Sequence, residues 1–406
     1  MNAADTGFII IASALVLLMT LPGLAMFYAG LVRAKNVLSV MMHCVSIAAL
    51  MSVVWLIAGY SLAFGEGSAY VGDFSKLFLA GIGRSEVAGT IPEIVFFLFQ
   101  MTFAIITPAL MVGAIPERVS FPFLLTFSTL WLLVVYAPVT HWVWGGGFLA
   151  QMHVMDFAGG LVVHATAGIS ALVLAIAIGK RRGFPKELQP PHNPGMTMIG
   201  AGLLWVGWFG FNGGSALAAN GDAGMAIVAT HLSASAAALT WMAMEWIRFK
   251  RPSMVGIVTG AVAGLATVTP ASGFVGPMGG LILGVAGSFI CFNAVDFVKH
   301  RLKIDDSLDV FAVHGVGGIL GSLLVAFLAM PSLGGIGYAE GMSAMSQLGV
   351  QALGVIITVA WSALASLGLV AALKPFMALR PHEEDVEEGL DISIHGERGY
   401  TLADRR

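Results

Sequence analysis

The chain has 406 residues, of which 57% are hydrophobic and only 11% are charged. Soluble domains carry about 25% charged residues, so this composition is typical of a membrane protein. The net charge of −3 argues against nucleic acid as a partner. The two cysteines, Cys44 and Cys291, lie far apart in apolar segments and imply no disulfide framework.

Apolar segments of about 20 residues or more, long enough to cross a bilayer, follow one another along most of the chain. They predict an all-α membrane protein with eleven transmembrane helices. The first segment has no basic region before it and is too long for the core of a signal peptide, so it is expected to stay as a span. The predicted spans are residues 8–31, 37–64, 93–114, 120–140, 157–179, 195–212, 223–247, 254–274, 277–298, 308–330 and 346–373.

Lysine and arginine are unevenly shared between the two sides of this predicted bundle. When the connections are assigned alternately to the two sides, 18 of the 20 basic residues fall on one side. The other side has only Lys76 and Arg84, in the connection 65–92. Because cytoplasmic loops are enriched in Lys and Arg, the N-terminus is expected outside and the C-terminus inside.

An acid, a histidine and a glycine recur at identical spacing in two of the spans. The two copies are Asp156, His164 and Gly168, and Asp306, His314 and Gly318. The fifth span is predicted to run inward and the tenth outward, so the copies point in opposite directions. This indicates an inverted repeat of five plus five spans with an eleventh helix added, a design that places a site at the midplane. Both histidines are expected about 12 Å deep, near the middle of a core roughly 30 Å thick.

An ionisable side chain inside the hydrocarbon region is costly and usually marks a pathway. His164 and His314 can be read as buried histidines bonded to neighbouring helices, but their duplicated placement favours a functional pair. Neutral imidazoles can donate and accept in a line, which suits passage of a small polar molecule or a proton. A metal site needs more than two ligands, and no third is well placed, so neither a metal nor a cofactor is expected.

Several residues near the outer ends of the spans have both a structural and a functional interpretation. Asp156 suits a helix N-cap and also a fixed charge that attracts a cation to the outer mouth. Trp144 suits the interfacial aromatic belt and also a face that binds a small cation. Phe103 and Phe211 are more often packing residues, and Ser215 is more often bonded to its own backbone.

The final segment differs in composition from the rest. Residues 1–373 form the predicted membrane domain, and residues 374–406 form a polar tail that is first acidic and then reads GLDISIHGERGY. This tail is too short to be a domain, so a docking segment on the cytoplasmic side is expected.

The chain resembles the ammonium transporter (Amt) branch of the Amt/Rh family along nearly its whole length. The resemblance rests on long, glycine-rich stretches: PGLAMFYAGLVRAKNVLS, GYSLAFG, ITPALMVGA, VWGGGFLA, DFAGGLVVHATAG, GWFGFNGGSA, TPASGFVG, DVFAVHGVGGILG, SLGGIGYAEG and GLDISIHGERGY. It implies an eleven-span homotrimer in the bacterial inner membrane, with one pore per subunit and a role in nitrogen metabolism. The tail resembles the segment at which PII-class signal proteins block the inner mouth.

The resemblance also implies roles for individual residues. They are the twin pore histidines His164 and His314, the outer cation site of Trp144, Phe103 and Ser215 with Asp156 nearby, the gate of Phe103 and Phe211, and the pore-lining Trp208.

The implied activity is passage of ammonium, ammonia and methylammonium through a hydrophobic pore. Ammonium and potassium are similar cations, so an aromatic site alone does not separate them. Deprotonation before entry does, because a dry pore penalises ions far more than a small neutral molecule. The alternative function is an ammonium sensor that acts through a partner protein. A membrane enzyme is not expected, since the chain has no recognisable nucleophile or metal cluster.

Overall fold

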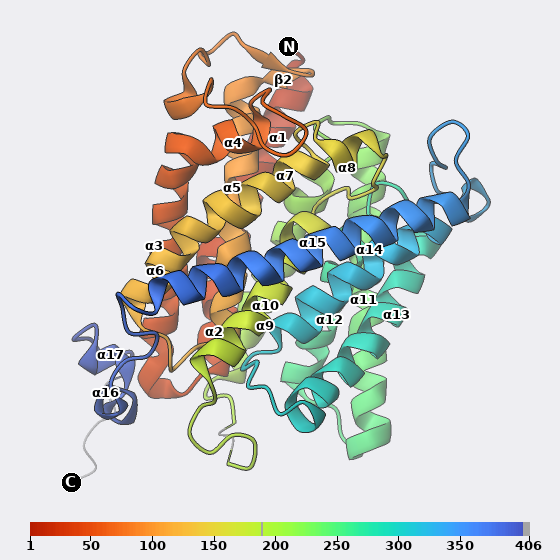
Figure 1. The fold of residues 1–406 in the computed structure, drawn as a ribbon. Helices are drawn as coiled ribbons and strands as arrows, with labels where there is room; N and C mark the ends of the chain where they lie inside the picture. The colour runs from red at the N-terminus through yellow and green to blue at the C-terminus, as the bar shows by residue number, and fades with distance from the viewer. Residues whose placement is uncertain (188–189, 401–406) are drawn as a thin grey trace.

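The computed structural model describes residues 1–187 and 190–400 and is built almost entirely of helices (Figure 1). A small antiparallel hairpin joins β1 (Val87–Ala88) to β2 (Ile91–Pro92), with Val87 opposite Pro92 and Ala88 opposite Ile91. No other strand occurs within these described residues. The hairpin lies at the end of the molecule that carries the N-terminus.

Several helices of the first half are long runs in which a π-helical turn separates two α-helices. The α-helices are α1 (Ala3–Leu18), α2 (Ala25–Leu31), α3 (Val37–Val54), α4 (Tyr60–Phe64), α5 (Glu93–Met111), α6 (Phe121–Trp131), α7 (Ala137–Val143), α8 (Phe148–Gln151) and α9 (Thr166–Ile178). The π-helical turns are Met19–Leu24, Trp55–Gly59, Leu132–Tyr136 and Gly160–Ala165. Single 3-10 turns are Ala34–Asn36, Leu77–Leu79 and Val112–Ala114.

The second half is built in the same way. Its α-helices are α10 (Pro194–Trp208), α11 (Gly221–Phe249), α12 (Met254–Val268), α13 (Pro277–Asp296), α14 (Val316–Leu328), α15 (Ala344–Leu373), α16 (Glu383–Glu388) and α17 (Leu390–Ser393). The π-helical turns are Phe209–Gly213, Phe297–Arg301 and Phe311–Gly315, and a 3-10 turn spans Pro331–Leu333.

Each predicted span overlaps one helical run, and nine of the runs within the described residues are long and apolar enough to cross a membrane. The chain is therefore a multi-pass membrane protein, whereas the count of eleven spans stays a prediction. Two boundaries differ from the sequence prediction. The first run begins at Ala3 because the Asn2 side chain caps it and Asp5 is buried against the N–H of Ala219 at 2.9 Å. α12 ends at Val268, shortly before Pro270, whose ring nitrogen has no hydrogen to donate.

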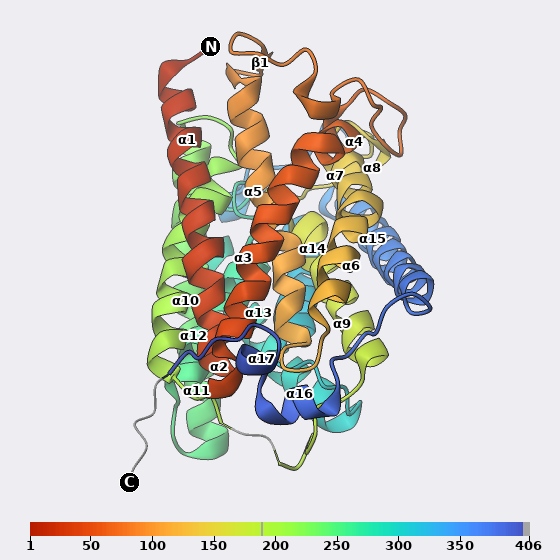
Figure 2. The same cartoon turned by 90° about the vertical axis from the view of Figure 1, so that its left-hand side faces the viewer.

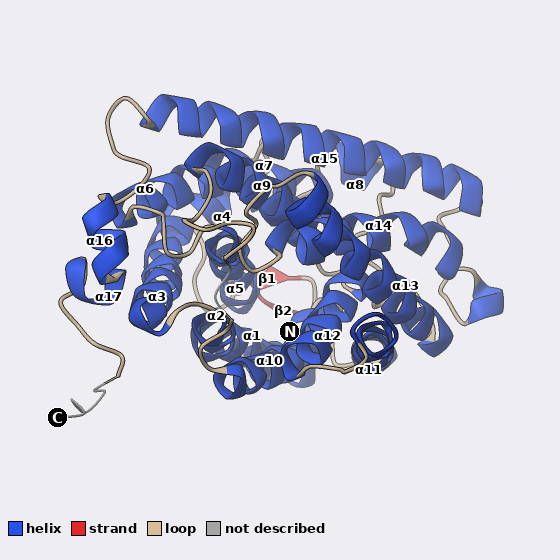
Figure 3. Cartoon of the chain, turned by 90° about the horizontal axis from the view of Figure 1, so that it is seen from below, coloured by secondary structure: helices blue, strands red, loops and turns tan. Residues whose placement is uncertain are grey.

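α15 is a straight helix of 30 residues that runs obliquely along one side of the bundle (Figures 1 and 3). It packs against α6 and α9 of the first half and against α14 of the second. It therefore joins the two halves without belonging to either copy of the repeat.

The N-terminus and the tail lie at opposite ends of the molecule (Figure 2). In the tail, α17 packs against α3 and the 3-10 turn before it, and α16 packs against α17. The Asp391 carboxylate accepts the backbone N–H groups of Leu38 at 3.1 Å and Ser39 at 2.7 Å, and thereby caps α3. Lys35 donates to the carbonyl oxygen of Val386 at 3.0 Å. Only residues 401–406 of the predicted tail lie outside the described residues.

Candidate functional site

The two copies of the repeated motif adopt the same local structure. In each, the acid accepts backbone N–H groups at the start of a π-helical turn, and a 13-residue α-helix follows (α9 and α14). The residue three positions after the acid has a positive φ in both copies, 113° at Gly159 and 63° at Asp309. The repeated spacing thus corresponds to a repeated backbone conformation and not only to similar letters.

The glycine four residues after each histidine lies where the two copies touch. A Cβ at Gly168 would meet the backbone of Gly315, and a Cβ at Gly318 would lie 2.6 Å from the Cβ of His164. Both distances are too short for real side-chain carbons, so a larger residue at either position would separate the copies. The glycines therefore allow the two π-helical turns to approach closely and bring the histidine rings together.

The two histidine rings are buried and lie side by side. Nδ1 of His164 is 3.2 Å from Nδ1 of His314, and the ring centroids are 5.2 Å apart at 19°. One of these two nitrogens must donate while the other accepts, so the pair shares one proton along this line when both rings are neutral. Nε2 of His164 has no partner among the described residues. It is thus available to bond a small molecule beside the ring.

A narrow enclosed cavity runs along the histidine pair. Its volume is about 10 Å³, which is about the room for one water-sized molecule. Apart from the two histidines and the Trp208 indole, its lining side chains are hydrocarbon or thioether: Met19, Leu24, Phe27, Ile106, Leu110, Val163, Leu204, Phe211 and Val262. Trp208 stacks on His164 at 5.5 Å between centroids and donates its indole N–H to the Thr269 hydroxyl at 2.9 Å. The indole N–H is therefore already occupied, and Trp208 presents an apolar face to the cavity.

A second, open pocket of about 300 Å³ is lined by aromatic side chains. The Phe103 and Trp144 rings are 5.8 Å apart and perpendicular, and Ser215 lines the same space. The Ser215 hydroxyl donates to the carbonyl oxygen of Phe211 at 2.8 Å. Its donor is thus used inside its own turn, and its lone pairs are left to accept from an N–H donor.

Two stacked phenylalanine rings separate the open pocket from the histidine cavity. Phe103 lines the pocket, and its ring stacks on Phe211 with centroids 4.2 Å apart. The Phe211 ring lies 6.2 Å from the ring of His164. The order along the molecule is therefore open pocket, phenylalanine pair, Trp208 and His164, and then His314.

Asp156 is buried beside the open pocket but does not line it. Its carboxylate accepts four backbone N–H groups at 2.6–3.1 Å, those of residues 159–162, and so serves as a helix cap. Its backbone carbonyl oxygen accepts the indole N–H of Trp144 at 2.8 Å. One residue thus fixes both the start of the histidine-bearing turn and the orientation of the Trp144 ring.

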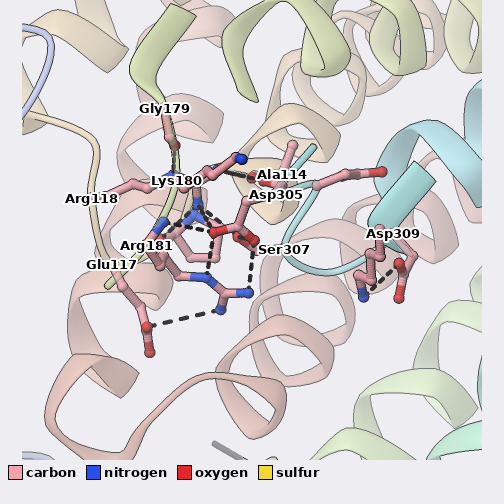
Figure 4. A network of polar contacts seen from close by, with 12 residues as sticks. Ala114, Glu117, Arg118, Gly179, Lys180, Arg181, Asp305, Ser307 and Asp309 are labelled. Atoms are coloured by element: carbon pink, nitrogen blue, oxygen red, sulfur yellow. Dashed lines mark hydrogen bonds and ion pairs between the residues drawn. The ribbon is translucent and has the colours of Figure 1, made fainter. Parts of the chain in front are cut away.

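Ion pairs fix the loops at the end of the molecule where the tail packs (Figure 4). Arg118 is fully buried and donates to the carbonyl oxygens of Gly179 at 2.7 Å and Ala114 at 3.0 Å, while burial lowers its pKa to about 10. Burial opposes ionisation of Asp305, but the hydrogen bonds and charge of Arg181, 2.9 Å away, outweigh this and hold the pKa of Asp305 below its usual value. This network joins loops that precede and follow the spans carrying the histidines.

The family of the chain follows from its similarity to known proteins. Residues 7–400 match the model of the Ammonium Transporter Family. The chain belongs to the ammonium transporter family. A relative named ammonium transporter from Bacillus subtilis is 42% identical over 98% of this chain and 99% of its own length. Members of this family are transporters, and the chain is therefore not an enzyme.

Solved structures of the ammonium transporter family have the same fold. A protein named Sensor Amt Protein superposes with a TM-score of 0.91 and 31% identity, covering 96% of this chain and 98% of its own. Mep2 from Candida albicans superposes with a TM-score of 0.87 and 37% identity, covering 95% of this chain and 88% of its own.

Some residues that shape this ammonium transporter's pockets were not singled out from the sequence. Gln100 and Phe157 line the open pocket, and Thr269 holds Trp208. Gln100 stands four residues after Phe96 and three before Phe103, a helical spacing that could have indicated that all three face the same side. Thr269 carried no such signal, since its partner lies 61 residues away.

Proposed function

We propose that this member of the family moves ammonium across the membrane by stripping a proton from it and passing ammonia along the histidine pair. Ammonium is recruited at the open pocket by the faces of Trp144 and Phe103 and by the lone pairs of Ser215. The stacked rings of Phe103 and Phe211 form the gate. The single observation that carries the proposal is the enclosed, almost wholly apolar cavity beside two histidines whose Nδ1 atoms are 3.2 Å apart.

The dry cavity selects the neutral form. A cation entering it would lose its water without gaining a charged partner, because no carboxylate among the described residues lines either the cavity or the open pocket. Ammonia keeps a lone pair and three N–H donors, and the rings of His164 and His314 offer polar groups along the way. Potassium cannot give up a proton and is excluded at the same step.

The proton left at the outer pocket has two possible routes. It returns to the outer solution, so that transport carries no charge, or it crosses separately along the two imidazoles, so that transport carries one charge per ammonia. In both routes the atoms balance, since ammonium divides into ammonia and one proton.

The arrangement in the membrane belongs to the same proposal. We propose eleven spans in two inverted halves, with the N-terminus outside and the tail inside. Two of the basic loops support the placement of the tail, because Lys35 donates to the carbonyl oxygen of Val386 and Arg182 pairs with Glu387. We further propose a homotrimer in the bacterial inner membrane, in contact with lipid. Residues 1–373 form the transport domain, and residues 374–406 form a regulatory tail that a PII-class protein recognises.

A sensor that signals through a partner protein is the alternative. One solved relative is named Sensor Amt Protein, but the more similar relatives of known sequence are named transporters. A sensor binds ammonium at the outer pocket without moving it, so transport by the purified protein distinguishes the two.

The test is the electrical current from purified protein in liposomes on a solid-supported membrane after a rapid jump in ammonium. A transient current that is absent after an equal potassium jump supports transport with charge movement, and accumulation of labelled methylammonium without current supports neutral transport. His164→Ala removes one member of the pair and should abolish the signal or admit potassium. If the purified protein binds ammonium but shows neither current nor accumulation, the sensor is favoured.

A further inference from the structure

The long helix α15 contributes a buried amide whose hydrogen-bonding groups are all used. Gln351 is fully buried. Its Oε1 accepts the backbone N–H of Met155 at 2.7 Å and the side-chain N–H of Gln347 at 3.1 Å. Its Nε2 donates to the carbonyl oxygens of Met155 at 2.8 Å and Ser322 at 2.7 Å. An amide has two acceptor positions and two donors, so no capacity remains for a ligand.

These bonds hold a segment that has no helix of its own. Residues 153–157 lie between α8 and the turn that bears His164. Gln351 takes both backbone groups of Met155, and Gln347 donates to the carbonyl oxygen of His153 at 3.0 Å. Met155 is buried, so its backbone groups need such partners. Side chains of α15 therefore replace the secondary structure that the segment lacks.

The held segment leads directly to the open pocket. The residue after Met155 is Asp156, whose carbonyl oxygen receives the indole N–H of Trp144 at 2.8 Å. The next residue, Phe157, lines the pocket. A shift of the Met155 peptide would thus move the acceptor that orients Trp144 and one wall of the pocket at the same time.

We propose that Gln351 is a positioning residue for cation recruitment and acts through Met155 and Asp156 on Trp144. This role rests on the proposed function of the open pocket as the recruitment site. Ser322 belongs to α14 and Met155 to the first half, so one amide also bonds the two halves to each other. α15, which lies outside the repeat, thereby sets the geometry of a pocket that it does not line.

The test is Gln351→Met, which keeps an unbranched side chain of similar length but forms none of the four bonds. In methylammonium uptake by proteoliposomes, the KM should rise about threefold to tenfold, within the range of a weakened cation–π contact. The maximal rate should stay within about twofold, because the four cap bonds of the Asp156 carboxylate still hold the histidine-bearing turn. A purely structural role predicts fewer folded molecules, and so a lower maximal rate, with an unchanged KM.

A double-mutant comparison with Trp144→Leu identifies the route of the effect. If Gln351 acts through Trp144, the double variant should have a KM close to that of Trp144→Leu alone, since the second change has nothing left to disturb. If the KM increases of the two single variants multiply in the double variant, Gln351 does not act through Trp144. An unchanged KM in Trp144→Leu would contradict the recruitment site itself, whereas an unchanged KM in Gln351→Met alone would overturn only the positioning role.

Two further variants guard against loss of folding. Thr358→Val changes a buried polar residue two turns along α15 whose hydroxyl has no partner among the described residues, and it should leave KM unchanged. If Gln351→Met does not reach the membrane, Gln351→Glu replaces it. A buried carboxyl that takes up a proton keeps one donor and one acceptor, so an intermediate rise in KM is expected, and an unchanged KM would overturn the proposal.

Discussion

Replacing Asp156 by asparagine separates its role as a helix cap from its charge. In the wild type, Oδ1 accepts the N–H groups of Gly159 and Gly160, and Oδ2 accepts those of Leu161 and Val162. Asparagine has one carbonyl oxygen, so it keeps two of these bonds and turns its NH₂ group toward the other two donors. A hydrogen bond to a charged group contributes about 1.5–3 kcal/mol, so Asp156→Asn should lower the free energy of unfolding by about 3–6 kcal/mol.

The second copy of the motif supplies a matched control. Asp306 caps its turn with three bonds, one on Oδ1 to Val310 and two on Oδ2 to Phe311 and Ala312. An asparagine there keeps the two bonds at the Oδ2 position and loses one, which corresponds to about 1.5–3 kcal/mol. The loss at Asp156 should therefore be about twice the loss at Asp306.

The measurement is reversible unfolding of the purified variants in mixed detergent micelles, followed by helix content. If Asp156→Asn and Asp306→Asn lower the free energy of unfolding equally, the loss does not scale with the number of cap bonds removed. Asp156→Ala removes all four bonds and should yield little folded protein, since the whole stability of a domain is about 5–15 kcal/mol. Asp156→Glu keeps the charge and should retain more transport per folded molecule than Asp156→Asn if the charge also attracts cations.

Further predictions concern the two ends of the molecule and the glycine contact. Trp144→Leu should raise the KM for methylammonium about 2- to 30-fold, the equivalent of a lost cation–π contact of about 0.5–2 kcal/mol, and an unaltered KM would argue against recruitment at this face. Gly318→Ala should separate the histidines and lower the transport rate, measured beside Gly202→Ala, whose added methyl meets open space. Asp391→Ala removes two cap bonds from α3 and should speed proteolysis of the tail and reduce binding of a PII-class protein in pull-down; equal proteolysis of both proteins would show that Asp391 does not hold the tail. The pKa of Asp305 is lower in the folded protein than its ordinary 3.8, so the ionised carboxylate stabilises the fold above pH 3.8, and this stabilisation is lost as pH falls through the folded pKa. The difference in unfolding temperature between wild type and Asp305→Asn should therefore be constant near neutral pH and shrink below about pH 4. A constant difference down to about pH 2 would contradict the ion pair.

The sequence carried a strong signal for the repeat because the acid, the histidine and the glycine each have a local structural reason. The acid caps the turn that immediately follows it, and the glycine removes a clash one turn beyond the histidine. Spacing along a helix fixes such relations, so they can be read without a structure. The length of the apolar segments likewise located the helical runs, because a helix that crosses a bilayer must stay apolar over about 20 residues.

Relations between distant segments carried no such signal. Gln351 holds Met155 across 196 residues, and its partners are backbone atoms that every residue possesses. Asp391 caps a helix that begins 354 residues earlier in the chain. Hydrophobic periodicity likewise does not reveal the π-helical turns at both histidines, because their extra residue per turn shifts the pattern only locally. These features depend on tertiary packing and require the structure.

The composition of the open pocket favours passage over retention. In the part of the chain that the structure describes, no carboxylate lines it, and Asp156, the nearest acid in sequence to Trp144, directs its charge at four backbone N–H groups. A carboxylate in the pocket would bind ammonium and potassium alike and would stabilise the charged form that must lose a proton. Aromatic faces and one hydroxyl bind a cation weakly, and conduction requires a site that is favourable enough to enter and weak enough to leave. Under the proposed function, weak recruitment followed by an apolar cavity would therefore place selectivity in the loss of the proton and not in the strength of binding.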